Sequence, residues 1–549
     1  MRYASILILA SCASSSEPMA VRFTNAPPVA AVDDRRPVAQ RPSHNLNLND
    51  YDFYRRAFEG PVVRSLELPG HRRARGVSSL DEVPDSTWFT NRIGIRDLTP
   101  DEIRKGPVDD DGPEAHKPWT IHSTKPGGTA VGFVITDARG VKYLISFDDI
   151  SRPEMETGTG VIVNRLLWAA GYNVPADSIA YIRREDLVIA PDAMIKDHLG
   201  IDRGPLDEET VNRKLSRAWR TPDGQLRVLA SRYLAGESLG GSPPSGVRDD
   251  DPNDRIPHEL RRDQRGLYPL AAWVDHIDLV QSNFLDMFVA DPANPQAHYV
   301  VHYLVDFGKS LGAMSVTDSF IREGWNFSFD WHFLFRDLFT LGLMPHPWND
   351  RTGPVPFGVS PTFVAQPFEP ARWRPDIPVP AFDEADRYDM FWGTKILARF
   401  TREQIGAAVD AARFSDPQAV AYLTETLVAR QQATIRTWFA RVNPLDGFAA
   451  TGRGLCFADL AIDHQLAAAG STHYELQSYD KAGRSIGAVT VPAAESGPTC
   501  TGDVIMSTAA DTYTIVRITT RRPAYAGSTF VHLAKAPTGE WRVIGVWRI

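Results

Sequence analysis

Three polar side chains in one stretch of the sequence have the spacing needed for phosphoryl transfer. Asp278 closes a tripeptide that begins with His276, Asn283 follows after four residues, and Asp306 opens an Asp-Phe-Gly motif at 306–308. The carboxylate of Asp278 can orient an acceptor hydroxyl, while oxygens of Asn283 and Asp306 can hold Mg²⁺ across the phosphates of a nucleotide. Asp278 and His276 are the candidate catalytic residues, with His276 expected to brace the loop rather than to act as an acid or base.

The elements around these residues predict a hairpin that returns the chain to its starting point. Residues 284–289 and 299–305 are strand-like, and a loop at 291–296 separates them. A hairpin after Asn283 would bring both candidate metal ligands, Asn283 and Asp306, to one cleft. The alternative is an ordinary hairpin that carries an amide and a carboxylate at its mouth by chance.

Upstream of this hairpin the pattern predicts a mixed α and β region. Residues 131–136 and 141–147 read as two strands joined by a turn. Apolar residues at helical spacing predict a helix over 159–170, which Gly171 ends. A further strand-like run covers 226–234. Together these elements supply a hairpin, a helix and a later strand before the candidate catalytic loop.

This order of motifs resembles the protein-kinase catalytic half, H-x-D-x-x-x-x-N, hairpin, D-F-G. The chain is similar to bacterial proteins of the kinase-like superfamily, including HipA-type and spore-coat CotH-type kinases. It looks closest to an uncharacterised family of exported proteins that shares the motifs at 81–86 (DEVPDS), 171–175 (GYNVP) and 303–308 (YLVDFG). The resemblance covers about residues 50–445. It implies a two-lobed kinase-like α+β domain that uses ATP and Mg²⁺.

The chain departs from the kinase pattern at two positions that normally form an ion pair. Ser146 stands where the resemblance expects a lysine, and Gly160 stands where it expects a glutamate on the next helix. Lys125 precedes the pair Gly127-Gly128 and could reach phosphates from above, so these three residues are the candidate nucleotide-binding group. The alternative is that Gly127-Gly128 forms a plain turn.

The N-terminus reads as a lipoprotein signal. A positive residue and a short apolar run lead into Leu9-Ala10-Ser11-Cys12, which fits the pattern that directs lipid onto a cysteine. We expect 1–12 to be a signal sequence ending in lipidated Cys12, and 13–50 to be a disordered tether. The membrane would then be a partner through the anchor, with the body in the cell envelope facing the periplasm or exterior. The alternative is an uncleaved apolar start with a chance cysteine.

The remaining chain divides into three expected parts. Residues 51–235 would form an N-terminal extension and N-lobe, and 236–445 a mostly helical C-lobe. Residues 446–549 read as a small all-β sandwich or barrel. Export favours a disulfide between Cys456 and Cys500, with two separate buried thiols as the alternative. A net charge of −9 with no basic stripe argues against nucleic acid as a partner.

Three other features of the sequence are weaker signals of function. Residues 236–240 match G-x-S-x-G, but the following glycine and prolines forbid the helix that this motif needs, so a flexible hinge is expected. The acidic loops 109–111 and 249–254 are expected to be solvated turns, with Ca²⁺ binding as the alternative. The aromatic residues in 325–348 mix spacings, so packed core is expected, and a sugar or lipid groove is the alternative.

Two functions follow from these observations. The first is a divergent phosphotransferase, dependent on a nucleotide and Mg²⁺, whose acceptor is an unidentified protein or small molecule. The second is a pseudokinase, that is, a lipoprotein with a kinase-like fold that serves as a binding protein or scaffold and has lost the residues that bind phosphate.

Overall fold

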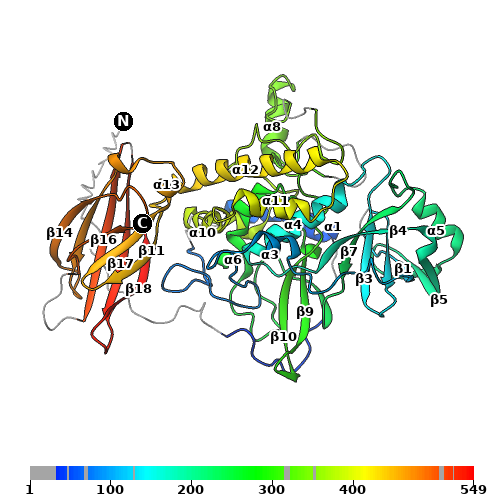
Figure 1. Cartoon of the computed structure of the whole chain (residues 1–549), viewed down its shortest axis with the longest axis horizontal. Helices are drawn as coiled ribbons and strands as arrows, with labels where there is room; N and C mark the ends of the chain where they lie inside the picture. The colour runs from blue at the N-terminus through cyan, green and yellow to red at the C-terminus, as the bar shows by residue number, and fades with distance from the viewer. Residues whose placement is uncertain are drawn as a thin grey trace, which may run out of the picture. The chain divides into compact units, whose positions relative to one another are not determined.

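The computed structural model describes residues 33–45, 49–66, 72–127, 130–313, 322–349, 354–505, 512–523 and 525–549. The expected signal sequence with Cys12, and Gly128, lie outside the described residues. The described chain is a mixed α+β protein that divides into two units (Figure 1), one of residues 33–78 and 82–441 and the other of residues 79–81 and 442–549. The division falls at 441/442, whereas the sequence predicted it at 445/446.

The first unit is built around a seven-stranded sheet. Its strands are β1 (Trp119–Thr124), β2 (Gly132–Thr136), β3 (Lys142–Phe147), β4 (Asp177–Ile182), β5 (Leu187–Lys196), β6 (Asp202–Pro205) and β7 (Leu226–Arg232). They lie in the order β4-β7-β3-β2-β1-β5-β6. The antiparallel pairing of β2 with β3 confirms the hairpin predicted there.

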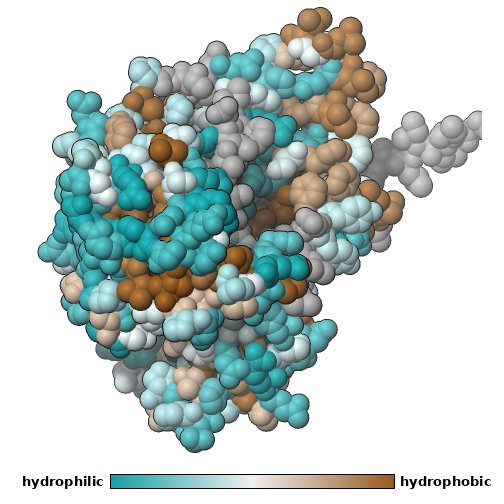
Figure 2. Space-filling view, turned by 90° about the vertical axis from the view of Figure 1, so that its right-hand side faces the viewer, coloured by the Kyte–Doolittle hydropathy of each residue, from teal (hydrophilic) through white to brown (hydrophobic). Residues whose placement is uncertain are grey.

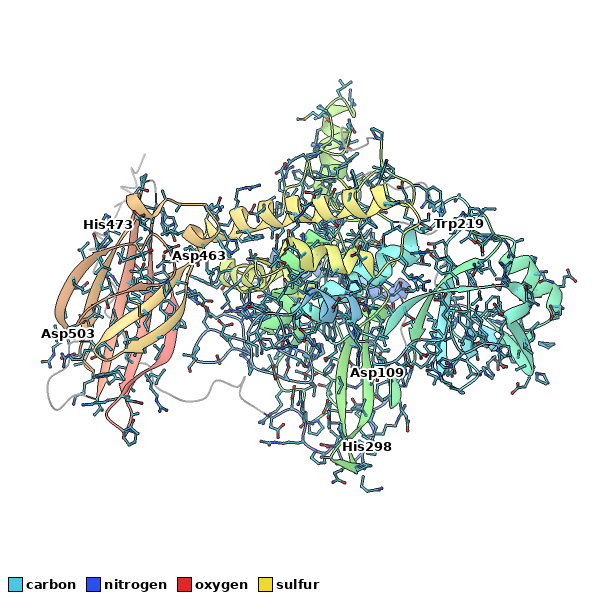
Figure 3. The ribbon with its side chains drawn as sticks, in the orientation of Figure 1. Asp109, Trp219, His298, Asp463, His473 and Asp503 are labelled. Atoms are coloured by element: carbon cyan, nitrogen blue, oxygen red, sulfur yellow. A yellow bond between two sulfur atoms is a disulfide. The ribbon has the colours of Figure 1, made fainter. Side chains whose placement is uncertain are left out.

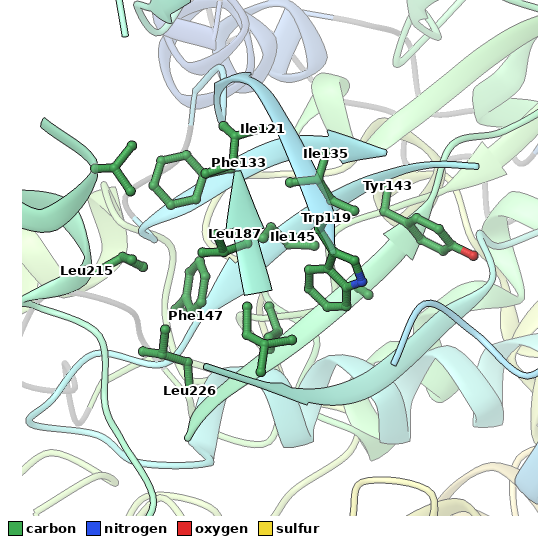
Figure 4. Close-up of a cluster of buried hydrophobic side chains, with 14 of the residues drawn as sticks. Trp119, Ile121, Phe133, Ile135, Tyr143, Ile145, Phe147, Leu187, Leu215 and Leu226 are labelled. Carbon is green, nitrogen blue, oxygen red and sulfur yellow. The ribbon is translucent and has the colours of Figure 1, made fainter. Parts of the chain in front are cut away.

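Apolar side chains of this sheet pack together in one core (Figure 4). Trp119, Phe133 and Ile145 are fully buried there, because each strand alternates its apolar residues toward one face. The helix α5 (Glu208–Leu215) adds Val211 and Leu215 to the same cluster. This core fixes β3, which carries Ser146, and β1, which Lys125 directly follows.

A buried helix, α4 (Met155–Ala170), packs against β3, β4 and β7. It begins four residues before the predicted start at Thr159, so Glu156 lies in its first turn. It ends as predicted before Gly171, whose φ of 129° favours glycine at the end of the helix. Because the helix starts earlier than predicted, its first turn includes the acidic residue Glu156.

A small second sheet follows in the same unit. Its strands β8 (Glu237–Gly241), β9 (Phe284–Asp291) and β10 (Asn294–Leu304) have the order β10-β9-β8. The β9–β10 pair confirms the predicted hairpin. The hinge predicted at 236–240 is wrong, because most of this stretch is strand β8, which pairs with β9.

The first unit also contains further helices, several of them short. They are α1 (Asn49–Tyr54), η2 (Arg55–Glu59), α2 (Gly60–Leu66), α3 (Pro100–Lys105), η3 (Arg184–Asp186), η4 (His258–Leu260), α6 (Arg262–Arg265), α7 (Leu267–Trp273), η5 (Gln281–Asn283), α8 (Trp331–Thr340), α9 (Pro380–Asp383), α10 (Arg387–Leu397), α11 (Arg402–Asp410) and α12 (Pro417–Phe439). The long α12 packs on α7, α10 and α11. The indole N–H of Trp273 at the end of α7 donates to the carbonyl of Leu427, 2.7 Å away. This packing holds the loop that leads to Asp278.

The second unit consists mainly of strands. One sheet has the order β11 (Leu445–Thr451), β12 (Gly454–Asp459), β15 (Thr499–Cys500), and the other β14 (Ser485–Pro492), β13 (His473–Tyr479), β16 (Tyr513–Arg522), β17 (Tyr525–Lys535), β18 (Trp541–Arg548). Short turns of helix, α13 (Leu460–Asp463) and η6 (Ala469–Ser471), join strands. Cys456 and Cys500 form a disulfide between β12 and β15, which confirms the predicted bridge.

The predicted tether extends too far toward the body of the protein. Residues 33–45 are held by polar contacts, since the carboxylate of Asp34 accepts from the backbone N–H of Thr87 at 2.9 Å. Likewise the backbone N–H of Ser43 donates to Asp250 at 2.7 Å. The prediction of disorder up to residue 50 is therefore wrong for this segment. No helix in the described part of the chain is long and apolar enough to cross a membrane.

Candidate active site

The loop that carries Asp278 runs beside the segment that follows Asp306. The backbone N–H of Ile277 donates to the carbonyl of Lys309 at 3.4 Å, and that of Leu311 donates to Val274 at 2.9 Å. These two bonds join stretches that are more than thirty residues apart in the sequence. The structure therefore brings the neighbourhoods of Asp278 and Asp306 together, as the hairpin predicted.

Asn283 and Asp306 lie at the same end of the β9–β10 hairpin. Leu304 pairs with Phe284, and the next backbone N–H, that of Val305, donates to the carbonyl of Asn283 at 3.0 Å. The far part of the hairpin, near His298 in Figure 3, points away from this end. The side-chain amide of Asn283 donates to the backbone carbonyl of Asp278 at 2.8 Å, which ties the loop to the hairpin.

Asp306 has a strained backbone. Its φ is 59°, in the left-handed region that residues other than glycine rarely adopt. Strain of this kind persists only where the surrounding structure imposes it, and it is common at functional sites. Here the hairpin on one side and the Ile277–Lys309 contact on the other impose it.

Asp278 forms an ion pair that was not predicted from the sequence. The ammonium of Lys309 lies 3.1 Å from Oδ2 of Asp278. Although burial opposes it, the carboxylates of Asp278 and Asp376 raise the pKa of Lys309. Lys309 directly follows the Asp-Phe-Gly motif, and this position was the signal that could have identified it.

Asp376 lies next to the same loop. Its backbone N–H donates to the carbonyl of Ile277 at 2.9 Å. Burial, with the nearby charge of Asp278, raises the pKa of the Asp376 carboxyl to about 7. Asp376 is thus a second acidic group at the site, and nothing in its local sequence marked it.

His276 is enclosed by the protein. Its Nδ1 lies 2.9 Å from the hydroxyl of Ser310, and its ring centroid is 5.5 Å from that of Phe307. Burial lowers the pKa of His276 to about 4, so the ring is neutral at physiological pH. These contacts suit a brace for the loop, because they join it to the segment after Asp306.

Lys125 reaches the strand position where the kinase pattern has its lysine. Lys125 follows β1, and its Nζ donates to the hydroxyl of Ser146 on β3 at 3.3 Å. Its backbone N–H donates to the carbonyl of Gly132 at 2.9 Å. A Cβ at Gly132 would lie 3.0 Å from Cδ of Lys125, so the absence of a side chain at 132 makes room for the lysine.

Glu156, and not position 160, is the acidic residue that α4 presents to this site. A Cβ at Gly308 would lie only 2.9 Å from Cγ of Glu156, so Glu156 packs directly on the Asp-Phe-Gly segment. Burial raises the pKa of Glu156 to about 8, although the positive charge of Lys125 opposes the rise. Gly160 instead faces Leu229, because a Cβ added at Gly160 would lie 3.0 Å from Cδ2 of Leu229. The assignment of Gly160 to the glutamate position is therefore wrong, because the helix starts one turn earlier than predicted.

Of the two glycines predicted to lie over phosphates, the structure describes only Gly127. Gly127 adopts a φ of 69°, and a Cβ there would lie 3.4 Å from the carbonyl of His198. These observations show a turn next to the β5–β6 connection, which was the alternative for this pair. Gly128 lies outside the described residues.

The candidate metal ligands suit a cation that is shared with a nucleotide. In the described ranges no group of three or more His, Cys, Asp or Glu side chains is placed to hold a metal ion. Mg²⁺ is commonly held by one or two carboxylates, with water and phosphate oxygens completing its shell. The hard oxygen donors of Asp306 and Asn283 fit that chemistry.

A buried ion pair supports the loop after Asp278. The guanidinium of Arg56 in η2 donates to the carbonyls of Leu279 at 2.9 Å and Pro378 at 2.7 Å, and it pairs with Asp52 at 3.0 Å. Asp52 also accepts from the backbone N–H of Gln281 at 3.1 Å. This pair was not predicted from the sequence, in which the spacing of four residues between Asp52 and Arg56 was a weak signal.

The two acidic loops differ from each other. In the first, Asp109 pairs with Arg232 at 2.7 Å near the surface. In the second, Asp254 is buried and its carboxylate lies 2.7 Å from Nε2 of His258. The prediction of a solvated turn is therefore wrong for Asp251 and Asp254, which are buried, and it holds for Asp249 and Asp250, which are exposed.

Comparisons with known proteins give one structural likeness. No protein-family model matches the chain, and no curated protein matches it. The crystal structure of the Golgi casein kinase with Mn/ADP bound overlaps with 58% of this chain and 71% of its own, at 11% identity and a TM-score of 0.26. An overlap of this quality does not by itself define a fold or an activity.

Proposed function

We propose that the protein is a divergent kinase-like phosphotransferase that uses a nucleotide and a divalent metal. One observation supports this most directly: the charges of Lys125 and Asp306 both act on Glu156, and Glu156 packs on Gly308 just after the β9–β10 hairpin. The Asp278–Lys309 ion pair lies beside the same segment. In this proposal the sheet and α4 form one lobe of a kinase-like domain, and the helices around α7 and α12 form the other.

Each residue has a role that follows from its chemistry. Asp306 and Asn283 would hold the metal, which when bound neutralises negative charge on the phosphates. Lys125 would contact phosphate oxygens, and Glu156, which packs on Gly308, would lie beside them. Asp278 would accept the proton of the acceptor hydroxyl as its oxygen attacks the terminal phosphorus and the bond to the nucleoside diphosphate breaks.

A specific observation also supports a binding protein without catalysis. The carboxylate of Asp278 is engaged by Lys309, and the loop beside it is tied down by Asn283. Because Ser146 replaces the expected lysine on β3, Lys125 is the one candidate residue whose positive charge could contact phosphate. A nucleotide-binding scaffold would need Lys125 and Asp306 but would tolerate the loss of Asp278.

Melting temperature and turnover separate these functions. The purified chain is heated with ATP or ADP in the presence of Mg²⁺ or Mn²⁺, and we expect a rise in melting temperature. Asp306→Asn, which tolerates the left-handed backbone at this position, should abolish the rise. Asp278→Asn should keep the rise but lose nucleotide turnover, and the exposed Asp192→Asn serves as the matched control.

The outcomes lead to different conclusions. If no nucleotide and metal pair raises the melting temperature, both functions fail. If the rise occurs and the unsubstituted chain has no turnover with any acceptor preparation, the scaffold function stands. If Asp278→Asn removes turnover while Asp192→Asn does not, the phosphotransferase stands.

We propose in addition that Cys12 carries lipid and holds the protein in the cell envelope. The support is the sequence Leu9-Ala10-Ser11-Cys12 after a short apolar run. Mass spectrometry of the N-terminal peptide should detect a diacylglyceryl group, and Cys12→Ser should release the chain from the membrane fraction. An unmodified Cys12 in membrane-associated protein would contradict this anchor.

A further inference from the structure

The helix α8 has its apolar stripe on the solvent side. Trp331, Leu334, Phe335, Leu338 and Phe339 occur at the spacing i, i+3, i+4, i+7, i+8 of one helix face. That face normally packs on a core, yet all five side chains are exposed, with Phe339 82% exposed. Figure 1 shows α8 standing out from the rest of its unit.

The turn after the helix extends this apolar face. Leu341 and Leu343 are each 83% exposed, and Met344 is 50% exposed. Brown, apolar atoms gather at the top of Figure 2, the end at which α8 lies in Figure 1. Exposed apolar patches of this kind on soluble proteins mark sites of interaction.

Two polar side chains of α8 contact each other and the segment that follows the helix. The guanidinium of Arg336 lies 2.9 Å from the carboxylate of Asp337, and His346 lies 3.4 Å from the same carboxylate. Arg336 also lies over the ring of Phe333, 4.7 Å from its centroid. The ionic contacts of α8 are therefore made within the helix and the segment after it, while its five apolar side chains remain exposed to solvent.

An open cavity lies at the base of the helix. Its volume is about 400 Å³, and its walls combine the rings of Phe329, Phe333 and Trp348 with the polar groups of Asp330 and His346. Packed core was expected for this aromatic region. Trp348 is buried, but Trp331 and Phe335 are not, so that expectation fails for α8.

The exposed face continues onto the N-terminal helices. The ring of Phe58 lies 4.6 Å from that of Phe329 and 6.3 Å from that of Trp331, measured between centroids. On the same N-terminal segment Tyr51, Tyr54, Val62 and Leu66 are exposed. The apolar surface, defined as these four residues together with the exposed side chains of 331–344, thus comes from two distant parts of the chain.

We propose that this apolar surface docks on a lipid bilayer, with α8 lying in the interface. The Trp, Phe and Leu side chains of this face are of the kind that interfacial membrane helices bury at the boundary between headgroups and acyl chains. Tyrosine and tryptophan side chains favour the headgroup level, where an apolar ring and a polar edge are both accommodated. A projecting helix and turn suit a fluid layer, because a bilayer needs no complementary pocket.

The proposed lipid anchor on Cys12 is consistent with a bilayer as the partner of this surface. Twenty residues, 13–32, separate Cys12 from the first described residue, and they could span up to about 70 Å. A lipid on Cys12 would therefore keep a bilayer within reach of the body. Docking does not depend on phosphotransfer, and it can be tested without any nucleotide.

Vesicle binding tests the proposal directly. The full chain with Cys12→Ser, which cannot accept lipid, is sedimented with vesicles of phosphatidylcholine and phosphatidylglycerol. We expect it to bind, and we expect Phe339→Glu combined with Leu343→Glu to weaken binding by at least about tenfold. The matched control combines Ile95→Glu with Leu199→Glu, which alters two exposed apolar residues elsewhere in the same unit and should bind like the unsubstituted chain.

A second measurement needs no charged substitution. Lipids brominated along the acyl chain should quench tryptophan fluorescence of the bound protein, and Trp331→Phe should remove part of that quenching. Absence of vesicle binding, or equal binding by the two double variants, would overturn the proposal. A dimer in light scattering without lipid that Phe339→Glu with Leu343→Glu dissociates would identify a second copy as the occupant and would overturn it as well.

Discussion

The ammonium of Lys125 donates a hydrogen bond to the hydroxyl of Ser146 across two strands of the same sheet, over 3.3 Å. Lys125 follows β1, whereas Ser146 occupies the β3 position at which the kinase pattern has a lysine. A cation is therefore present at this position although its own strand does not supply it. The charge of Lys125 also acts on Glu156 in α4, where it opposes the rise in pKa that burial causes.

The first prediction concerns this lysine. Lys125→Met should raise the dissociation constant for a metal–nucleotide pair roughly 10- to 100-fold, since a hydrogen bond to a charged group contributes about 1.5–3 kcal/mol. Titration calorimetry measures the change. Lys142→Met is the matched control, because Lys142 is exposed at the first position of β3, 4.4 Å from the ring of Tyr233.

A swap of the two residues tests the geometry. Lys125→Ser combined with Ser146→Lys returns the lysine to β3 and should recover part of the lost affinity. Equal affinity of Lys125→Met and the unsubstituted chain would show that Lys125 does not contact the nucleotide.

A second prediction follows from a buried carboxyl on β4. Burial raises the pKa of Asp177 to about 7, and its Oδ1 has no hydrogen-bond partner. Between pH 4 and pH 7 the folded chain holds a proton here that the unfolded chain releases, so this group's contribution to stability is lost as the pH rises through that window. Asp177→Asn cannot lose this contribution, and it should be more stable than the unsubstituted chain at pH 8 but not at pH 4.

Urea unfolding at both pH values measures this difference. Glu156 and Asp376 also have raised pKa values, and they affect both proteins in the same direction. The difference between the two proteins therefore isolates Asp177. A difference that does not depend on pH would contradict a buried, protonated Asp177.

Local patterns in the sequence predicted the parts of the fold that depend on neighbouring residues. The two hairpins and the end of α4 at Gly171 were predicted, because strand alternation, turn residues and a helix-ending glycine are local signals. The start of α4 was missed because Glu154, the residue before the helix, makes no side-chain cap and has a φ of 62°. That error alone moved the acidic position from Glu156 to Gly160.

Contacts between distant segments could not be predicted in this way. Lys125 meets Ser146, and Arg56 meets Leu279, only because the sheet and the helices have already formed. The outward face of α8 was missed for a related reason. Its periodicity predicts an amphipathic helix but cannot say whether the apolar side faces a core or an external partner.

The third prediction concerns the second unit. Cys456 and Cys500 are 44 residues apart, and closing a loop of that length contributes about 4 kcal/mol on the chain-entropy model. Replacing both cysteines with serine should lower the melting temperature of this unit's transition in calorimetry. A reductant should produce the same shift in the unsubstituted chain and none in the variant. An unchanged transition in both experiments would show that the bridge does not stabilise the unit.

The last prediction concerns the support of the candidate catalytic loop. Arg56→Ala removes the bonds to Leu279 and Pro378 and leaves the carboxylate of Asp52 buried without its cation. Breaking a buried pair in this way costs about 3–5 kcal/mol, which urea unfolding can measure. Arg55→Ala is the matched control, because Arg55 is the adjacent residue and is exposed, so its loss should change stability by less than about 0.5 kcal/mol.

Replacing both partners separates charge burial from support of the loop. Arg56→Leu combined with Asp52→Leu removes the buried charges, so it should recover stability relative to Arg56→Ala. The backbone carbonyl of Leu279 would still lack its donor, and the N–H of Gln281 its acceptor. Turnover should therefore remain low in the double variant although its stability recovers. Full turnover in that variant would show that the pair stabilises the fold without positioning the loop that follows Asp278.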